Sequence, residues 1–143
     1  MKVLIDDVLY GPIGAEQPPA DTLPDGYLSP HFREEEFCCN HCNSMEGHEI
    51  PEMLLSILED CRRYFGSVPT TINSGYRCKT HNDNVGSNDA SQHRLATAAD
   101  IVLKGVSPSL VHSYLLDMYP SDYGIGRYDS FTHIDVRPTK ARW

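Results

Sequence analysis

Two polar stretches that lie far apart in the sequence most constrain how this chain can fold. Residues 91–101 contain His93 and, seven positions later, Asp100, while residues 131–137 contain His133. Two imidazoles and one carboxylate suit Zn²⁺, and three protein ligands leave one position of a tetrahedron open, as in a catalytic site. Asp100 also enters an apolar run, where an unpaired carboxylate is costly to bury and a metal would remove that cost. We therefore expect the fold to bring the two stretches together around zinc.

Residues 130–136 alternate in the way that predicts a strand with one polar face. A period of two places His133 and Asp135 on one side, and Ile134 and Val136 on the other. Because Ile134 and Val136 suit a core, His133 and Asp135 should face a cleft.

Apolar periodicity elsewhere predicts two helices and several short strands. Apolar residues recur every three or four positions in 51–65 and again in the segment that begins at Ser107-Pro108. Strands are expected at 68–73, 98–103, 123–128 and 130–136. This pattern favours a single compact α+β domain with a small, mainly antiparallel sheet, flanking helices and the zinc site in a cleft.

The start of the domain and its longest loop are predicted from segments that lack apolar periodicity. Residues 11–26 contain four prolines and little periodicity, so residues 1–27 are predicted to be an extended N-terminal arm and 28–143 the domain. Ser29 is a candidate N-cap of a short helical turn. Residues 79–92 are expected to form a polar loop, and loops of this length are usually functional.

Charge and hydropathy narrow the class of protein. A net charge of −8 leaves no basic excess to neutralise phosphates, so we expect no nucleic-acid partner. Acidic residues interrupt the N-terminus where a signal peptide would stay apolar, and no stretch is long enough to cross a bilayer. We expect a monomer made in the cytoplasm without a signal peptide and without membrane insertion.

The five cysteines include one metal-like pair. Cys39 and Cys42 have the C-x-x-C spacing of half a zinc knuckle, with Cys38, His41 and His48 nearby, but no second C-x-x-C completes it. An odd number of cysteines without a signal peptide favours reduced thiols over disulfides. Reduced, half-buried thiols are therefore the favoured interpretation, and a structural metal is the alternative.

Several short motifs follow one another along the chain. They are Ser74-Gly75-Tyr76-Arg77, Asn84-Val85-Gly86, Ser91-Gln92-His93 with Asp100-Ile101, Gly124-Ile125-Gly126-Arg127-Tyr128, and Phe131-Thr132-His133-Ile134-Asp135 with Arg142-Trp143. In this order they resemble the motifs of the zinc D-Ala-D-Ala carboxypeptidase family, and the resemblance covers about residues 28–143. That family includes phage and bacterial L-alanyl-D-glutamate endopeptidases and shares its fold with the Hedgehog signalling domain.

The resemblance implies an enzyme that cuts peptide bonds involving D-amino acids in peptidoglycan stem peptides. It implies one catalytic Zn²⁺ held by His93, Asp100 and His133. Arg77 would bind a substrate carboxylate or polarise the scissile carbonyl, and Ser91 and His81 are the other candidates for substrate contact. Within this family, the small size and the lack of a signal peptide favour a phage-type lysis enzyme or a virion-associated peptidase. Such an enzyme would act on the cell wall after release from the cell or as part of a virion.

The proton acceptor is the point at which this chain departs from the family. Many members place an acid or histidine two or three residues before the last ligand, but here those positions are Phe131 and Ser130. Asp135 is the first candidate for this role, although it could instead orient a ligand. Asp129 is the second candidate.

Two other functions are compatible with the same residues. The missing acid would suit a non-catalytic binding module that keeps its zinc for structure. The chain could also be a cytosolic D,D-dipeptidase that acts on free dipeptides.

Overall fold

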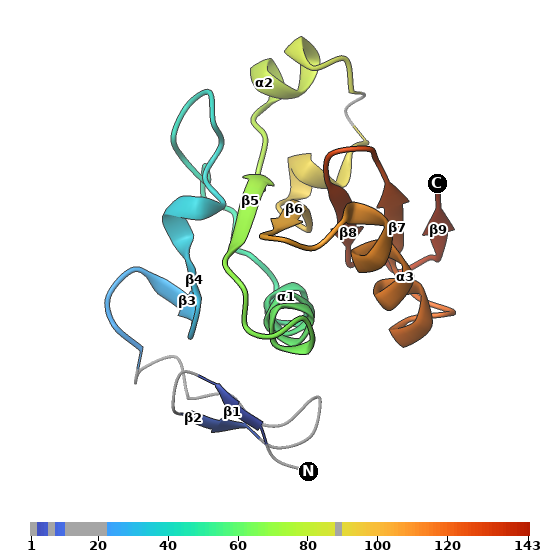
Figure 1. The fold of residues 1–143 in the computed structure, drawn as a ribbon. Coiled ribbons are helices and arrows are strands. Elements are labelled where there is room, and N and C mark those ends of the chain that lie inside the picture. Colours follow the sequence, from blue (N-terminus) through green and yellow to red (C-terminus); the bar gives the residue numbers. More distant parts are fainter. Residues whose placement is uncertain (1–2, 6–7, 11–22, 88–89) are drawn as a thin grey trace.

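A five-stranded sheet forms the centre of the computed structural model, which describes residues 3–5, 8–10, 23–87 and 90–143 (Figure 1). The strands lie in the order β5-β6-β8-β7-β9. Their bounds are Thr70–Ser74 for β5, Ala98–Leu103 for β6, Gly124–Arg127 for β7, Thr132–Asp135 for β8 and Ala141–Arg142 for β9. Neighbouring strands pair antiparallel except β7 and β9, which are parallel. The predicted mainly antiparallel sheet is confirmed.

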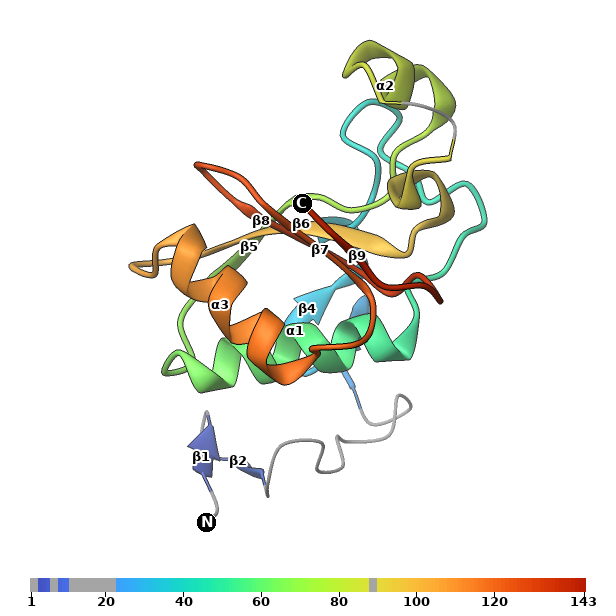
Figure 2. The same ribbon diagram turned by 90° about the vertical axis from the view of Figure 1, so that its right-hand side faces the viewer.

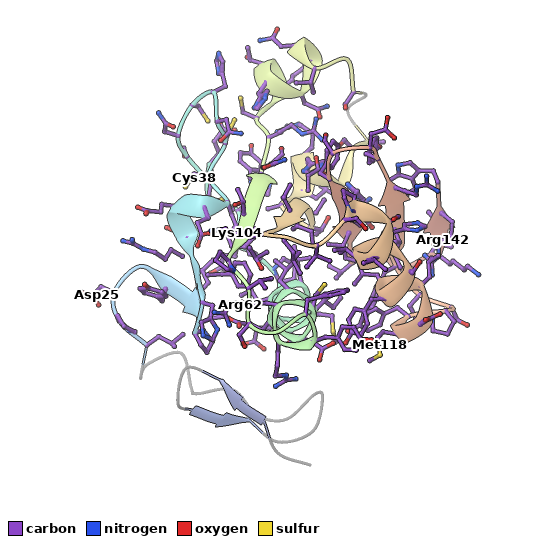
Figure 3. The ribbon with its side chains drawn as sticks, in the orientation of Figure 1. Asp25, Cys38, Arg62, Lys104, Met118 and Arg142 are labelled. Carbon is purple, nitrogen blue, oxygen red and sulfur yellow. The ribbon has the colours of Figure 1, made fainter. Side chains whose placement is uncertain are left out.

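Two helices, α1 (Glu52–Tyr64) and α3 (Pro108–Met118), cover one face of the sheet, which Figure 2 shows nearly edge-on. Side chains fill the space between the two layers (Figure 3). Ser107 begins α3 as its N-cap, because its Oγ accepts a hydrogen bond from the N–H of Leu110. The fully or almost fully buried core includes Leu54, Ile57, Leu58, Ile101, Leu115, Ile125 and Ile134. The predicted α+β class is confirmed.

The side chains of strand β8 alternate between the apolar core and the opposite, polar face of the sheet. Ile134 is fully buried in the core, so alternation turns His133 and Asp135 to the opposite face. The register pairs Asp100 of β6 directly with His133 of β8. Residues 33 positions apart in the sequence thus become neighbours across two strands.

The predicted helical turn at Ser29 is wrong. Ser29 ends strand β3 (Tyr27–Ser29), which pairs with β4 (Phe32–Arg33), and a 3-10 turn, η2, follows only at Glu34–Glu36. The Oγ of Ser29 donates to Glu59 Oε2 at 2.7 Å instead of capping a helix. This buried hydrogen bond ties the hairpin to α1.

The predicted polar loop at 79–92 begins with a short helix and leads into a second helical segment. Helix α2 occupies Lys79–Asn84, and the 3-10 segment η3 occupies Gln92–Leu95. Cys78 is the N-cap of α2, because its Sγ accepts a hydrogen bond from the N–H of His81. The residues usually expected at this position are Ser, Thr, Asp and Asn, so the sequence did not indicate a cap made by sulfur.

Only part of the predicted arm is described. Strand β1 (Val3–Ile5) pairs antiparallel with β2 (Val8–Tyr10), while residues 11–22 lie outside the described residues. Across the described ranges, none of the helices has the length and apolar character that crossing a membrane requires.

Candidate active site

His93, Asp100 and His133 gather on the sheet face that the helices leave uncovered. Their ligand atoms all lie within 4.8 Å of one another. Asp100 Oδ1 is 3.3 Å from His93 Nε2 and 2.9 Å from His133 Nδ1. Ligand atoms bonded to tetrahedral zinc at about 2.0 Å are roughly 3.3 Å apart, so the spacing fits a shared ion.

The hydrogen bonds of His93 fix which of its nitrogens is available. His93 Nδ1 lies 2.7 Å from the carbonyl oxygen of Gly75, which can only accept, so Nδ1 carries the proton. The buried Nε2 then presents a lone pair, and it has no hydrogen-bond partner among the described residues. A buried nitrogen in this state fits a metal ligand.

His133 is oriented by a carboxylate on its other side. Its Nε2 donates to Asp135 Oδ2 at 2.7 Å, which leaves Nδ1 to face Asp100. Asp135 is fully buried, and Arg137 binds both of its oxygens through Nε and one terminal nitrogen. A carboxylate behind a ligating histidine raises the basicity of the ligand and fixes its ring.

The pKa shifts show the electrostatic pull of this group. Burial raises the pKa of Asp100, but its hydrogen bond with His133 and the close approach of His93 outweigh burial and lower the pKa to about 2. Burial lowers the pKa of His133, whereas the carboxylates of Asp100 and Asp135 raise it further than burial lowers it. The negative charge of these carboxylates favours either a proton on His133 or a metal cation beside it. Zinc must therefore displace the proton from the imidazole in order to bind.

A cleft of about 460 Å³ opens over the three residues. Besides the candidate ligands, its walls include Arg77, Ser91, Gln92, Tyr128, Arg137 and Trp143. Arg77 and Arg137 give the cleft positive charge in a chain that is acidic as a whole.

Arg77 is the cleft residue with an unused donor. Its Nε is buried and has no hydrogen-bond partner among the described residues, while NH1 lies 3.4 Å from Ser87 Oγ. Burial lowers the pKa of Arg77, yet arginine stays charged at any ordinary pH. Its backbone N–H donates to the carbonyl of His93, so the chain holds Arg77 beside a candidate ligand.

The other predicted site residues lie in different surroundings. Ser91 lines the cleft and caps η3 by accepting the N–H of His93. His81 does not line the cleft; its Nδ1 contacts the sulfur of Cys39. Asp129 is exposed in the turn between β7 and β8 and is not among the described residues that line the cleft, although its neighbour Tyr128 is.

Comparison with known proteins agrees with this geometry. The sequence model of the family described as Peptidase M15 matches residues 30–135, which is more than half of the chain. The chain belongs to the peptidase M15 family. M15 peptidases are zinc-dependent, in keeping with the donor set of His93, Asp100 and His133. No curated protein shows significant similarity to this chain.

Arg137 and Tyr128 are parts of the M15 cleft that sequence reasoning did not assign to the site. Arg137 lies two residues after Asp135, and extending the period of two from His133 would have placed it on the same face. Tyr128 ends the motif Gly124-Ile125-Gly126-Arg127-Tyr128, which by itself indicates no role for its side chain. Its hydroxyl accepts a hydrogen bond from the indole N–H of Trp143 at 2.8 Å.

Replacing Asp135 with asparagine is expected to weaken zinc binding by about ten- to a hundred-fold, as loss of a carboxylate behind a ligating histidine generally does. Zinc titration of the metal-free protein would measure this, with fluorescence of Trp143 as the readout. Trp143 is the only tryptophan, and its ring centroid is 4.9 Å from that of His133. The exposed Asp117 on α3 provides the control, Asp117→Asn. Unchanged affinity in Asp135→Asn would show that Asp135 does not support the ligand.

Replacing Gly126 with alanine is expected to displace Trp143 from the cleft wall. A Cβ at position 126 would lie 2.5 Å from atoms of the Trp143 indole, and the ring must move. We expect a shift in tryptophan emission and a loss of hydrolysis of about ten- to a hundred-fold, because small misplacements near reacting groups are costly. An unchanged emission spectrum would contradict this packing.

Proposed function

We propose that this M15 peptidase hydrolyses peptide bonds involving D-amino acids in peptidoglycan stem peptides. One observation carries the proposal. The buried Nε2 of His93, without a hydrogen-bond partner among the described residues, meets Asp100 and His133 at the floor of an open cleft. This donor set suits one Zn²⁺ with a position left open for water.

The residues around the ligands suggest how a substrate is held. When bound, zinc supplies Lewis acidity, which polarises a carbonyl oxygen and makes water more acidic. Arg137 already makes a two-point contact with Asp135, so Arg77 is the guanidinium available to the substrate. Stem peptides carry free carboxylates, which match the paired N–H donors of an arginine. Arg77 would bind such a carboxylate or the oxyanion of the attacked carbonyl.

The two proposed proton acceptors differ in their surroundings. Asp135 is enclosed by His133 and Arg137, and these contacts lower its pKa despite its burial. We therefore favour Asp135 as the group that orients His133. Asp129 is exposed beside Tyr128 and is our candidate for accepting the proton from water and passing it to the leaving amine.

Asp129→Asn tests that role. We expect hydrolysis to fall by about a hundred-fold or more, with zinc content unchanged. A normal rate in this variant would exclude Asp129 as the proton acceptor.

The biological setting that we propose is phage lysis or a virion-associated enzyme that degrades the wall. This proposal rests on the resemblance of the sequence motifs to a family that includes phage endopeptidases. We expect the chain to act as a monomer, with no nucleic-acid partner and no insertion into membranes.

Incubating the zinc-loaded protein with purified sacculi tests the proposed function. We expect new amino groups and shortened stem peptides, which mass spectrometry would identify together with the bond that is cut. His133→Ala is the inactive control. Turnover of free D-Ala-D-Ala without any attack on sacculi would favour a dipeptidase, and binding to sacculi without new amines would favour a non-catalytic module. Either result would overturn the proposal.

A further inference from the structure

A second group of metal-ligand side chains lies outside the cleft. The sulfur atoms of Cys39, Cys42 and Cys78 all lie within 4.8 Å of one another. Figure 3 shows sulfur atoms gathered between the loop that follows Cys38 and the segment that leads into α2. His81 joins the group, because its Nδ1 is 3.5 Å from Cys39 Sγ.

The spacing of these residues in the sequence has the form of a zinc site. Cys39 and Cys42 make one C-x-x-C half, and Cys78 and His81 make a C-x-x-H half. A second half with cysteine only does not exist in the chain, but helix α2 brings the histidine into place. Cys78 is the N-cap of α2, and His81 lies three residues later on the same side of its first turn.

The distances agree with tetrahedral coordination. With Zn–S bonds of about 2.3 Å and Zn–N bonds of about 2.0 Å, neighbouring ligand atoms are roughly 3.5–3.8 Å apart. The contact of 3.5 Å between His81 and Cys39 falls in this range. Cys61 differs in kind, because it lies in the apolar core and belongs to no such cluster among the described residues.

Backbone N–H groups point at two of the sulfur atoms. Those of His41 and Cys78 each lie 3.4 Å from Cys39 Sγ. The N–H of His81 lies 3.4 Å from Cys78 Sγ. Neutral thiols are weak acceptors, whereas thiolates bound to a metal gain from donors of this kind.

Two other states of the cluster fit less well. A disulfide would join two of the sulfur atoms and leave the third cysteine and His81 without a role, and all described cysteines are free thiols. His41 is a rival for the fourth position, since its Nδ1 lies 3.8 Å from Cys78 Sγ. It is exposed, however, whereas His81 is half-buried and makes the shorter contact.

We propose that Cys39, Cys42, Cys78 and His81 bind a second, structural Zn²⁺. Four protein ligands would close the site to water, as is typical of structural zinc. The ion would fasten the irregular loop after Cys38 to the start of α2. Because Arg77 immediately precedes Cys78, the same ion would hold one wall of the catalytic cleft in place. This inference does not depend on which bond the enzyme cuts.

Metal analysis of the full chain, purified under reducing conditions, tests the proposal. We expect about two zinc ions per chain, and X-ray absorption should detect sulfur neighbours at about 2.3 Å from zinc. Cys42→Ser removes the exposed ligand and should lower the count by about one, together with the sulfur signal. Cys38→Ser is the matched control, since Cys38 lies outside the cluster and its thiol faces the carbonyl of Glu34.

Cobalt substitution provides a second readout. It uses the unmodified chain, so it does not depend on whether the variants fold as stably as that chain. The cobalt form of the unmodified chain should show the intense near-ultraviolet absorption of thiolate bound to cobalt. Absence of both this band and sulfur neighbours of zinc, or a disulfide among these cysteines in freshly purified protein, would overturn the proposal. Loss of the second ion in His41→Ala but not in His81→Ala would overturn the assignment of the fourth ligand.

Discussion

Replacing Asp100 with asparagine is expected to lower stem-peptide hydrolysis by at least about a thousand-fold. Asp100 Oδ1 lies 3.3 Å from His93 Nε2 and 2.9 Å from His133 Nδ1, and Asp100 is the charged member of the ligand set. Lewis acidity contributes several kcal/mol of transition-state stabilisation, and each 1.36 kcal/mol is a factor of ten in rate. Amine release from sacculi, with zinc content measured on the same sample, would check the prediction.

The control for Asp100→Asn is another replacement of aspartate by asparagine, on the opposite side of the sheet from the cleft. Asp117 is exposed on α3, so Asp117→Asn should keep both its zinc and its rate. Asp100→Asn should lose the ion from the cleft and retain the one bound by the cysteines. A rate in Asp100→Asn within about tenfold of normal would exclude Asp100 as a ligand of a catalytic ion.

Replacing Arg77 with alanine is expected to lower kcat/KM by about a hundred- to a thousand-fold, the usual loss when a donor to a developing oxyanion is removed. Zinc content should not change, because Arg77 is not among the candidate ligands. Arg77→Lys should recover only part of the rate, since an ammonium group cannot make the two-point contact of a guanidinium.

The kinetic constants of Arg77→Ala would also identify its partner in the substrate. If Arg77 binds a carboxylate in the ground state, KM should rise; if it stabilises the oxyanion, kcat should fall with little change in KM. Arg127→Ala, at the exposed end of β7, is the matched control. Normal kinetics in Arg77→Ala would show that the substrate does not use the unpaired donor of this side chain.

Four of the five strands of the sheet could be predicted from apolar periodicity, whereas the short β9 was not expected. The gathering of His93, Asp100 and His133 could be predicted from their residue types together with the alternation in β8. Alternation in β8 puts Ile134 in the core and His133 on the opposite face. The sequence does not specify the register, yet the register makes Asp100 and His133 direct partners across β6 and β8. Residue types suited to zinc supplied that missing information.

Features that depend on contacts between distant residues could not be predicted from the sequence. Ser29 has the composition of an N-cap, but its hydroxyl binds Glu59 on α1. His81 looks like a polar loop residue until α2 places it against Cys39. Asp135 is a different case, because Arg137 lies only two residues later and makes two contacts with its carboxylate. Extending the alternation of β8 as far as Arg137 would have indicated this pair.

Removal and return of zinc in a single sample of the full chain test the central claim most directly. After a chelator strips the metal, amine release from sacculi should fall to the level of His133→Ala. Amine release should then return as zinc refills the site of His93, Asp100 and His133. The fluorescence of Trp143, which lies beside His133, would monitor this refilling. Hydrolysis that persists after zinc has been removed, or zinc binding at these residues without any recovery of hydrolysis, would contradict the account.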